Sequence, residues 1–461
     1  MRRQEKISLT ILTFGAFWSL LCSTLMNIAL PILMRTFQVS AEQVQWVSNG
    51  YMLVNALMIP ISAYLIKRFS FRRLFLGFTS VFLIGTILGS SAPSFWLVVF
   101  ARMIQAIGAG VMVPLVNVMA IRYAPKGKQG SVMGFIGLAF NFSPIIGPTL
   151  SGVILTYFSW RYLFILLIPF LAAVLLVGFK ELPLETHDVA LSFDYRGLVF
   201  ISLGLWFLLW ALSNVSRLLT GEGLLIGLSL LAAVVFWILF IRLQLKTKQP
   251  LVNLNVFKTR QFTFALLINS LIVATMYGNT ILLPLLVQNS MHKSPLVSGL
   301  VILPGALITG LMSSTSGKFY DRFKIKHLVL IGLSIDLTGT LLQMLIGAQS
   351  SIWMVTLGQA VRQSGLVLML IPLQTHSLVY LKRSQLPDGV AIFNTLRQVA
   401  ATVGTALIVA AITITDAHLH VPNSRVGIQV GFGICLCLLL IAVTQALHLQ
   451  NAKEIVNQNE A

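Results

Sequence analysis

The sequence predicts an all-α membrane protein with fourteen spanning helices, arranged as two six-helix repeats plus an inserted two-helix hairpin. Of its 461 residues, 57% are hydrophobic and only 10% are charged, whereas about a quarter of the residues in a soluble domain are charged. Long apolar stretches recur along the chain, and a bilayer crossing needs about 20 mostly apolar residues. Segments of the first half also recur in the second half. A soluble globular fold is therefore excluded.

Fourteen apolar stretches are long enough to span a membrane. The first follows a basic N-terminus and is too long for the apolar core of a signal peptide, so we expect it to be a spanning helix. The stretch at 197–213 is short. The expected spans are residues 7–33, 45–66, 74–91, 95–120, 130–157, 161–179, 197–213, 223–241, 262–287, 297–317, 327–347, 351–380, 390–414 and 426–447.

The net charge of +19 would also fit a nucleic-acid-binding protein, but the positions of the basic residues favour a membrane. Most of the 32 lysines and arginines fall in alternate loops, which is the positive-inside pattern of cytoplasmic loops. This pattern predicts a multi-pass protein of the cell membrane with both termini in the cytoplasm. Its basic loops would lie near anionic lipid headgroups, and no nucleic-acid partner is needed.

The three cysteines are not arranged for a metal or a disulfide. They are Cys22, Cys435 and Cys437, all in apolar stretches, and none shows the spacing of a zinc site. Residues two apart on a helix face different directions, so Cys435 and Cys437 are poor disulfide partners. We expect no metal and no other cofactor.

An internal repeat relates the two halves. Residues 62–74 align with residues 316–328, which places Asp321 at the position of Lys67. Parallel repeats of six spans are typical of transporters whose substrate site lies between the halves. The other aligned pairs are Pro31 with Pro284, Pro114 with Pro372, and Gln105 with Gln363.

The repeat divides the chain into four parts. The two spans between the repeats have no counterpart and form the inserted hairpin. The parts are an N-terminal half (1–180), the hairpin with its flanking loops (181–257), a C-terminal half (258–450) and a cytoplasmic tail (451–461).

Residues 141–152 place two prolines one helical turn apart in the middle of an apolar stretch. Pro144 and Pro148 each lack a backbone donor and disturb the helix before them. A membrane helix tolerates such a defect only against neighbouring protein or a wet cavity. A helix that bends in mid-membrane favours a moving part, and so favours transport.

Four segments resemble signatures of the major facilitator superfamily, specifically its drug:proton antiporter family with fourteen spans. They are the first-helix segment 24–31, the basic turn 62–74, the fourth-helix segment 102–110 and the fifth-helix antiporter motif with Pro144, Gly147, Pro148 and Gly152. The resemblance implies a secondary active transporter that exports drug-like amphiphilic molecules in exchange for protons by alternating access. It also implies that a monomer is functional.

The chain departs from the family pattern at two places. The family's first helix usually carries an aspartate where this chain has Cys22, and its basic turn usually carries an acid where this chain has Lys67. The second repeat keeps its acid. The cytoplasmic gate that the resemblance implies would consist of Lys67, Arg68, Asp321 and Arg322.

Four charged residues fall at membrane depth, where charge is costly and therefore functional by default. They are Arg102, Asp336, Arg362 and Arg397. At 1.5 Å per residue, Asp336 lies roughly 13 Å from one face and Arg362 roughly 16 Å from the other. In a core about 30 Å thick the two meet at one level, which predicts an ion pair. The pair can be a static lock between helices or a proton-sensitive switch.

Arg102 has no acid at its level. We expect Asn27 or Gln105 to accept its hydrogen bonds, in a coupling or gating role or a structural one, since an unpaired buried cation is expensive. Arg397 is closer to the cytoplasmic side, where an arginine can reach the headgroups.

Intramembrane charge is mainly positive, which favours neutral, zwitterionic or anionic substrates over permanent cations. Any one of the candidate cavity residues could equally serve helix–helix hydrogen bonding. The candidates are Asn27, Tyr51, Asn55, Asn117 and Asn141 in the first half, and Asn269, Tyr277 and Gln363 in the second.

Four other functions can be compared with the sequence. An embedded enzyme would need paired carboxylates or a His/Asp set, and acids at membrane depth are nearly absent, so we expect no enzyme. A nucleotide-driven pump would need a Gly-x-x-x-x-Gly-Lys-Ser/Thr sequence, which the chain lacks. A dedicated exporter of one endogenous metabolite or lipid would use the same fold. A non-transporting membrane scaffold is the remaining alternative.

Overall fold

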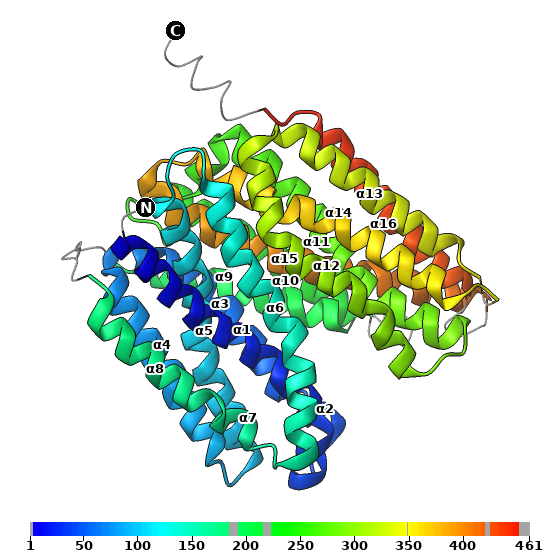
Figure 1. Cartoon of the computed structure of the whole chain (residues 1–461), viewed down its shortest axis with the longest axis horizontal. Coiled ribbons are helices and arrows are strands. Elements are labelled where there is room, and N and C mark those ends of the chain that lie inside the picture. Colours follow the sequence, from blue (N-terminus) through cyan, green and yellow to red (C-terminus); the bar gives the residue numbers. More distant parts are fainter. Residues whose placement is uncertain (1–2, 184–191, 215–222, 348, 420–424, 451–461) are drawn as a thin grey trace.

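The computed structural model is a bundle of long helices in two halves (Figure 1). It describes residues 3–183, 192–214, 223–347, 349–419 and 425–450, and these ranges contain no strand. The first half consists of α1 (Arg3–Phe37), α2 (Ala41–Val44), α3 (Trp46–Arg68), α4 (Phe71–Ser90), α5 (Phe95–Tyr123), α6 (Gln129–Tyr157), α7 (Tyr162–Ile165) and α8 (Leu167–Glu181).

The inserted hairpin and the second half follow in chain order. The hairpin is α9 (Tyr195–Ser213) and α10 (Gly223–Lys246), and a 3-10 turn, η2 (Leu254–Lys258), leads into the second half. The second half consists of α11 (Arg260–Leu285), a π-helical turn η3 (Leu286–Ser290), α12 (Pro295–Arg322), α13 (Ile325–Leu345), α14 (Ile352–Val379), α15 (Leu386–Leu419) and α16 (Arg425–Ala446).

Each predicted span corresponds to helical structure. Thirteen helices of the described chain are long and apolar enough to cross a membrane. The remaining predicted span, 130–157, is α6, a helix of 29 residues. The span predicted at 161–179 consists of α7 and α8. The prolines of residues 141–152 do not interrupt α6, which packs against α1 and α12 along its length.

The two halves repeat the same packing. In the first half α4 packs on α5 and α3 packs on α5; in the second, α13 packs on α14 and α12 packs on α14. Likewise α1 packs on α6 as α11 packs on α15. The repeat seen in the sequence is therefore a repeat of three-dimensional structure.

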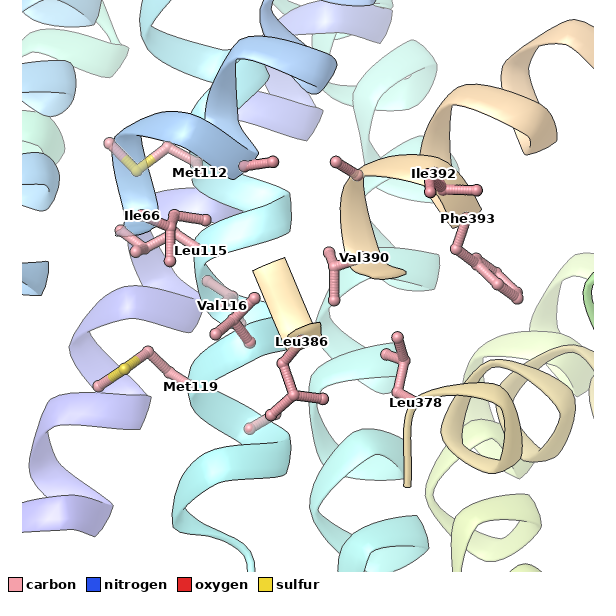
Figure 2. Close-up of a cluster of buried hydrophobic side chains, with 14 of the residues drawn as sticks. Ile66, Met112, Leu115, Val116, Met119, Leu378, Leu386, Val390, Ile392 and Phe393 are labelled. Carbon is pink, nitrogen blue, oxygen red and sulfur yellow. The ribbon is translucent and has the colours of Figure 1, made fainter. Parts of the chain in front are cut away.

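The halves meet near the face that holds Arg3 and Gln450, here called the terminal face, and diverge toward the opposite face (Figure 1). One buried apolar cluster contains residues of both halves (Figure 2), including Leu115 and Met119 of α5 and Leu386 and Val390 of α15. The clusters nearer the opposite face each belong to one half. The chain is thus closed at the terminal face.

The hairpin attaches mainly through α9. Its two helices pack on each other, and α9 also contacts α3 and α15, one helix from each half. The carboxylate of Asp194 caps α9 by accepting the Gly197 N–H at 2.8 Å. In contrast, α10 leaves most of its apolar side chains exposed, which is the composition of a lipid-facing helix.

Candidate functional site

The intramembrane pair predicted from the sequence forms in the second half. Arg362 Nε lies 3.1 Å from Asp336 Oδ1, and the two residues are 1% and 0% exposed. The guanidinium also donates to Thr340 Oγ1 at 3.1 Å and to the carbonyl of Thr275 on α11 at 2.9 Å. The pair therefore joins α13 and α14 and holds both against α11.

One carboxylate oxygen of Asp336 is left over. Oδ1 contacts Arg362 and, at 3.4 Å, the Thr340 hydroxyl. Oδ2 is buried and has no hydrogen-bond partner in the part of the chain that the structure describes. A buried charged oxygen without a partner is costly, so Oδ2 is the oxygen of this pair at which a proton can bind.

Two glycines bring the helices of this pair into backbone contact. A Cβ on Gly339 of α13 would lie 2.6 Å from the backbone nitrogen of Arg362, and a Cβ on Gly365 of α14 would lie 2.7 Å from that of Asp336. No side chain separates the two helices at these points. The acid and the arginine are therefore positioned by backbone packing rather than by long, flexible side chains.

Arg102 on α5 is the buried arginine of the first half, and its partners are neutral. It is 1% exposed and donates to Gln105 Oε1 at 3.0 Å, Cys22 Sγ at 3.1 Å, and the carbonyls of Cys22 and Val47 at 3.4 Å. Its guanidinium carbon lies 4.1 Å from the ring centroid of Tyr51. Gln105 is the acceptor predicted from the sequence; the side chain of Asn27 lies outside the described part.

The structure corrects the register between the halves. A Cβ on Gly85 would meet the backbone nitrogen of Gln105, just as one on Gly339 meets that of Arg362. Gln105 also donates to the Thr86 hydroxyl at 2.8 Å, just as Arg362 donates to Thr340. Gln105 is thus equivalent to Arg362 and not, as the sequence alignment predicts, to Gln363.

With this register, the two halves carry Arg and Gln in opposite order. The first has Arg102 and Gln105; the second has Gln359 and Arg362. The glycine contacts also show that Phe82 occupies the position of Asp336. A Cβ on Gly108 would contact the backbone nitrogen of Phe82, and a Cβ on Gly365 would contact the backbone nitrogen of Asp336. The buried acid therefore belongs to the second half alone in this pseudo-symmetric position.

At the terminal face, Asp321 of α12 binds the start of α6 in the other half. Its two oxygens accept the backbone N–H groups of Gly130 and Ser131, both at 2.8 Å, and the Ser131 hydroxyl. Lys128, the residue that precedes α6, makes no side-chain cap. A carboxylate at this helix N-terminus is favoured by the helix dipole, so Asp321 supplies the missing cap across the interface between the halves.

The equivalent contact, between α3 of the first half and α15 of the second, is made by a lysine where the first contact has an aspartate. Lys67 at the end of α3 binds Asp388 Oδ1 at 2.5 Å, and Asp388 lies in the first turn of α15. In each contact, a charged residue of one half binds the first turn of a helix in the other half. A carboxylate lies at both helix starts: Asp321 at the start of α6 and Asp388 at the start of α15. Sequence reasoning missed Asp388, because the alignment of Lys67 with Asp321 shows the opposite charges of the two positions but not the partner of either.

The other two predicted gate residues, Arg68 and Arg322, have different surroundings. Arg68 binds the hydroxyl of Tyr64 on its own helix and lies over the rings of Tyr64 and Phe69. Arg322 is exposed. Of the four predicted gate residues, Lys67 and Asp321 make the contacts between the halves described above.

The antiporter motif contacts its own half. Gly147 lies against α1, where a Cβ would be 2.0 Å from Thr24 Oγ1, whereas a Cβ on Gly152 would meet no atom within 4 Å. Neither of these two glycines makes a close approach to the second half. The close approach to the other half comes earlier in α6, where a Cβ on Gly317 of α12 would lie 2.0 Å from the carbonyl oxygen of Gly130.

The predicted cavity residues fall into different environments. Tyr51 belongs to the Arg102 cluster and donates to the carbonyl of Ser19 at 3.3 Å. Asn141 bridges the halves by donating to Ser313 Oγ at 2.7 Å. Asn117 and Asn269 are buried, Asn55 and Gln363 are half-buried, and Tyr277 is 40% exposed.

The comparisons with known proteins agree with this architecture. A family model described as the Major Facilitator Superfamily matches residues 12–405. An uncharacterized MFS-type transporter, YcnB, of Bacillus subtilis (strain 168) is 34% identical over 98% of this chain and 96% of its own length. The lincomycin resistance protein LmrB of Listeria monocytogenes is 31% identical, with 95% of each chain covered.

A more distant relative and two solved structures complete the comparison. The multidrug export protein EmrB of Haemophilus influenzae is 30% identical over 86% of this chain and 78% of its own. The human organic anion transporter MFSD10 has the same fold with a TM-score of 0.69 at 15% identity, covering 96% of this chain and 99% of its own. The proton:xylose symporter XylE has a TM-score of 0.65 at 13% identity, covering 97% and 96%. The chain therefore belongs to the major facilitator superfamily and is a multi-span membrane transporter rather than an enzyme.

Proposed function

We propose that the protein exports drug-like amphiphilic small molecules across the cell membrane by proton-coupled antiport. The relatives named for lincomycin resistance and multidrug export support this substrate class. The carrying observation is the buried Asp336–Arg362 pair with its free Oδ2. In this proposal both termini lie in the cytoplasm, so the terminal face is the cytoplasmic one, and a monomer is functional.

Proton binding at Asp336 would change the balance of charge at a helix junction. The ionised carboxylate neutralises Arg362 and holds α13 and α14 against α11 through the Thr275 carbonyl. Once Oδ2 is protonated, Arg362 loses its counter-charge, and a buried cation without one is strongly unfavourable. The helices would then favour an arrangement in which Arg362 reaches water or substrate.

Alternating access would begin from a state closed at the terminal face. The contacts of Asp321 and Lys67 close that face, and they would have to break for the cytoplasmic side to open. The described intramembrane groups carry a net positive charge, because Arg102 has only neutral partners among the contacts given above. Neutral, zwitterionic or anionic substrates would therefore be favoured over permanent cations.

A substrate screen in inside-out vesicles, with and without a proton gradient, tests the proposal. Drug uptake that requires the gradient, and proton efflux triggered by several chemically different drugs, are the expected results. Transport of a single endogenous metabolite or lipid would instead support the dedicated exporter, which the same fold accommodates. Absence of any flux would favour a scaffold.

Asp336→Asn tests the coupling site. We expect loss of proton-driven uptake, because the amide cannot take up the proton, while gradient-independent exchange of substrate continues. The control is Glu181→Gln, which removes an exposed acid at the end of α8 outside the junction. Melting curves of both purified variants establish that they fold. Proton coupling that survives in Asp336→Asn would place the proton site elsewhere.

A further inference from the structure

A cavity of about 860 Å³ opens at the terminal face of the second half. It lies between the starts of α11 and α13 and the end of α16, outside the interface between the halves. None of the charged groups of the proposed coupling site lines it. The transport proposal therefore leaves this cavity without a role.

The cavity is basic. Arg260, Lys324, Lys326, His327 and His448 line it, and no acidic residue of the described ranges does. Two long helices, α11 and α13, also begin here, and neither has a side-chain cap. Helix N-termini attract anions, so both helix starts add to the positive potential at the cavity.

One wall of the cavity is apolar. Phe257, Phe264, Leu447 and Leu449 contribute to the lining. The ring of Phe264 stacks on His448 with centroids 5.5 Å apart, and the Nδ1 atom of His448 lies 3.1 Å from the Thr444 carbonyl. The basic and apolar sides together fit a ligand with an anionic head and a hydrocarbon part.

The same place in the first half is closed. The cavity found there, between α1, α4, α5 and the residues that follow α8, has a volume of about 10 Å³. Arg72, which the repeat aligns with Lys326, donates to the carbonyls of Phe179 and Leu182 at the end of α8. The repeat therefore places equivalent helix ends together in both halves. In the first half Arg72 occupies the space between them, and in the second half the space is open and lined by basic residues.

We propose that this cavity binds the phosphate headgroup of an anionic phospholipid, with the glycerol and first acyl carbons against the phenylalanines. Basic cavities between spanning helices on the cytoplasmic side are suited to such headgroups. Free phosphate shares the head chemistry but would leave the apolar wall unused. The proposal does not depend on what the protein transports.

The test measures thermal unfolding of the full-length protein in phosphatidylcholine vesicles with increasing phosphatidylglycerol. The variant is Arg260→Gln with Lys324→Gln and Lys326→Gln. The matched control removes three exposed basic side chains elsewhere, with Lys126→Gln, Lys180→Gln and Lys246→Gln. Native mass spectrometry of the same proteins counts the phosphatidylglycerol molecules that stay bound.

We expect phosphatidylglycerol to raise the unfolding midpoint of the wild type and the control, with one retained lipid. Each basic side chain removed from the cavity should weaken the apparent lipid affinity about fivefold. An equal loss of lipid affinity in the control would show that the lipid responds to general surface charge, and would overturn the proposal. Inorganic phosphate or glycerol phosphate giving the full effect in pure phosphatidylcholine would overturn it in favour of a soluble ligand.

Discussion

At the scale of single residues, the partner of each buried arginine decides which half can bind a proton. Arg362 faces a carboxylate with a free oxygen, whereas Arg102 faces a thiol, an amide and carbonyls. A neutral amide or carbonyl satisfies hydrogen bonds but does not change charge at physiological pH. The second half therefore carries the coupling in our proposal, although the family usually places an acid in the first helix.

Restoring that acid tests the environment of Arg102. Cys22→Asp would place a carboxylate near the guanidinium, because the Cys22 sulfur already lies 3.1 Å from it. We expect the variant to fold with Arg102 present. In an Arg102→Gln background the same change should cost about 3 kcal/mol or more, since it leaves a buried unpaired charge.

Denaturant unfolding of the four proteins of this cycle measures the coupling. Cys22→Asn serves as the uncharged control. Its effect on the free energy of unfolding should differ much less between the Arg102 and Arg102→Gln backgrounds. Equal destabilisation by Cys22→Asp in both backgrounds would mean that residue 22 and Arg102 are not paired in solution.

At the scale of helices, glycine contacts fix how α13 crosses α14. Gly339→Ala would place a methyl group 2.6 Å from the Arg362 backbone nitrogen, so the helices would have to separate. We expect a loss of about 1–3 kcal/mol, the usual cost of overpacking, together with weaker proton coupling as Asp336 and Arg362 move apart. Unfolding and proton-driven uptake are both measured.

Gly77→Ala in α4 is the matched control, because a Cβ there meets nothing within 4 Å. It should be neutral or stabilising by up to about 1 kcal/mol through helix propensity. Similar behaviour of the two alanine variants would argue against a tight crossing at Gly339.

The sequence predicts the spans and the repeat well because both depend on local composition. Helix register is different, because a shift of one residue hardly changes hydropathy. The sequence alignment pairs Pro114 with Pro372 and Gln105 with Gln363, but the backbone contacts of Gly85 and Gly339 pair Gln105 with Arg362. Only packing between helices could reveal this.

Of the two ion pairs described above, one could be predicted from the sequence and the other could not. The Asp336–Arg362 pair was predictable because the two residues lie at one depth on consecutive helices. The Lys67–Asp388 pair joins residues far apart in the sequence, and Asp388 precedes the expected span 390–414. Depth cannot place such a residue, because its position depends on how the two halves close.

At the scale of the whole molecule, the Lys67–Asp388 contact is also connected to the inserted hairpin by hydrogen bonds. Asp388 Oδ1 accepts the backbone N–H of Asn253 at 2.9 Å. The next residue back, Val252, donates to Gln244 of α10 at 3.1 Å, and Gln244 donates to Asp194 at 2.6 Å. The hairpin is thus hydrogen-bonded to the contact that closes α3 on α15.

A charge exchange tests whether this contact controls the closed terminal face. Lys67→Asp opposes two carboxylates, and Asp388→Lys opposes two ammonium groups. Hydrogen bonds to charged groups contribute about 1.5–3 kcal/mol, so each single change should shift the population toward an open terminal face about tenfold or more. The double variant should recover part of the closure, because a lysine at the start of α15 opposes the helix dipole and leaves the Asn253 N–H without its carboxylate.

Spin labels at Gln43 and His292, both exposed and one in each half, would report the separation of the halves. The exposed Cys437 is first replaced by serine. The open terminal face should shorten this distance in both single variants, and the double variant should give an intermediate distribution. Lys248→Asp, at an exposed lysine of the linker after α10, should leave the distribution unchanged. If the double variant behaved like the sum of the two single variants, Lys67 and Asp388 would not act as a pair, and the α6–α12 contact through Asp321 would have to close the terminal face without them.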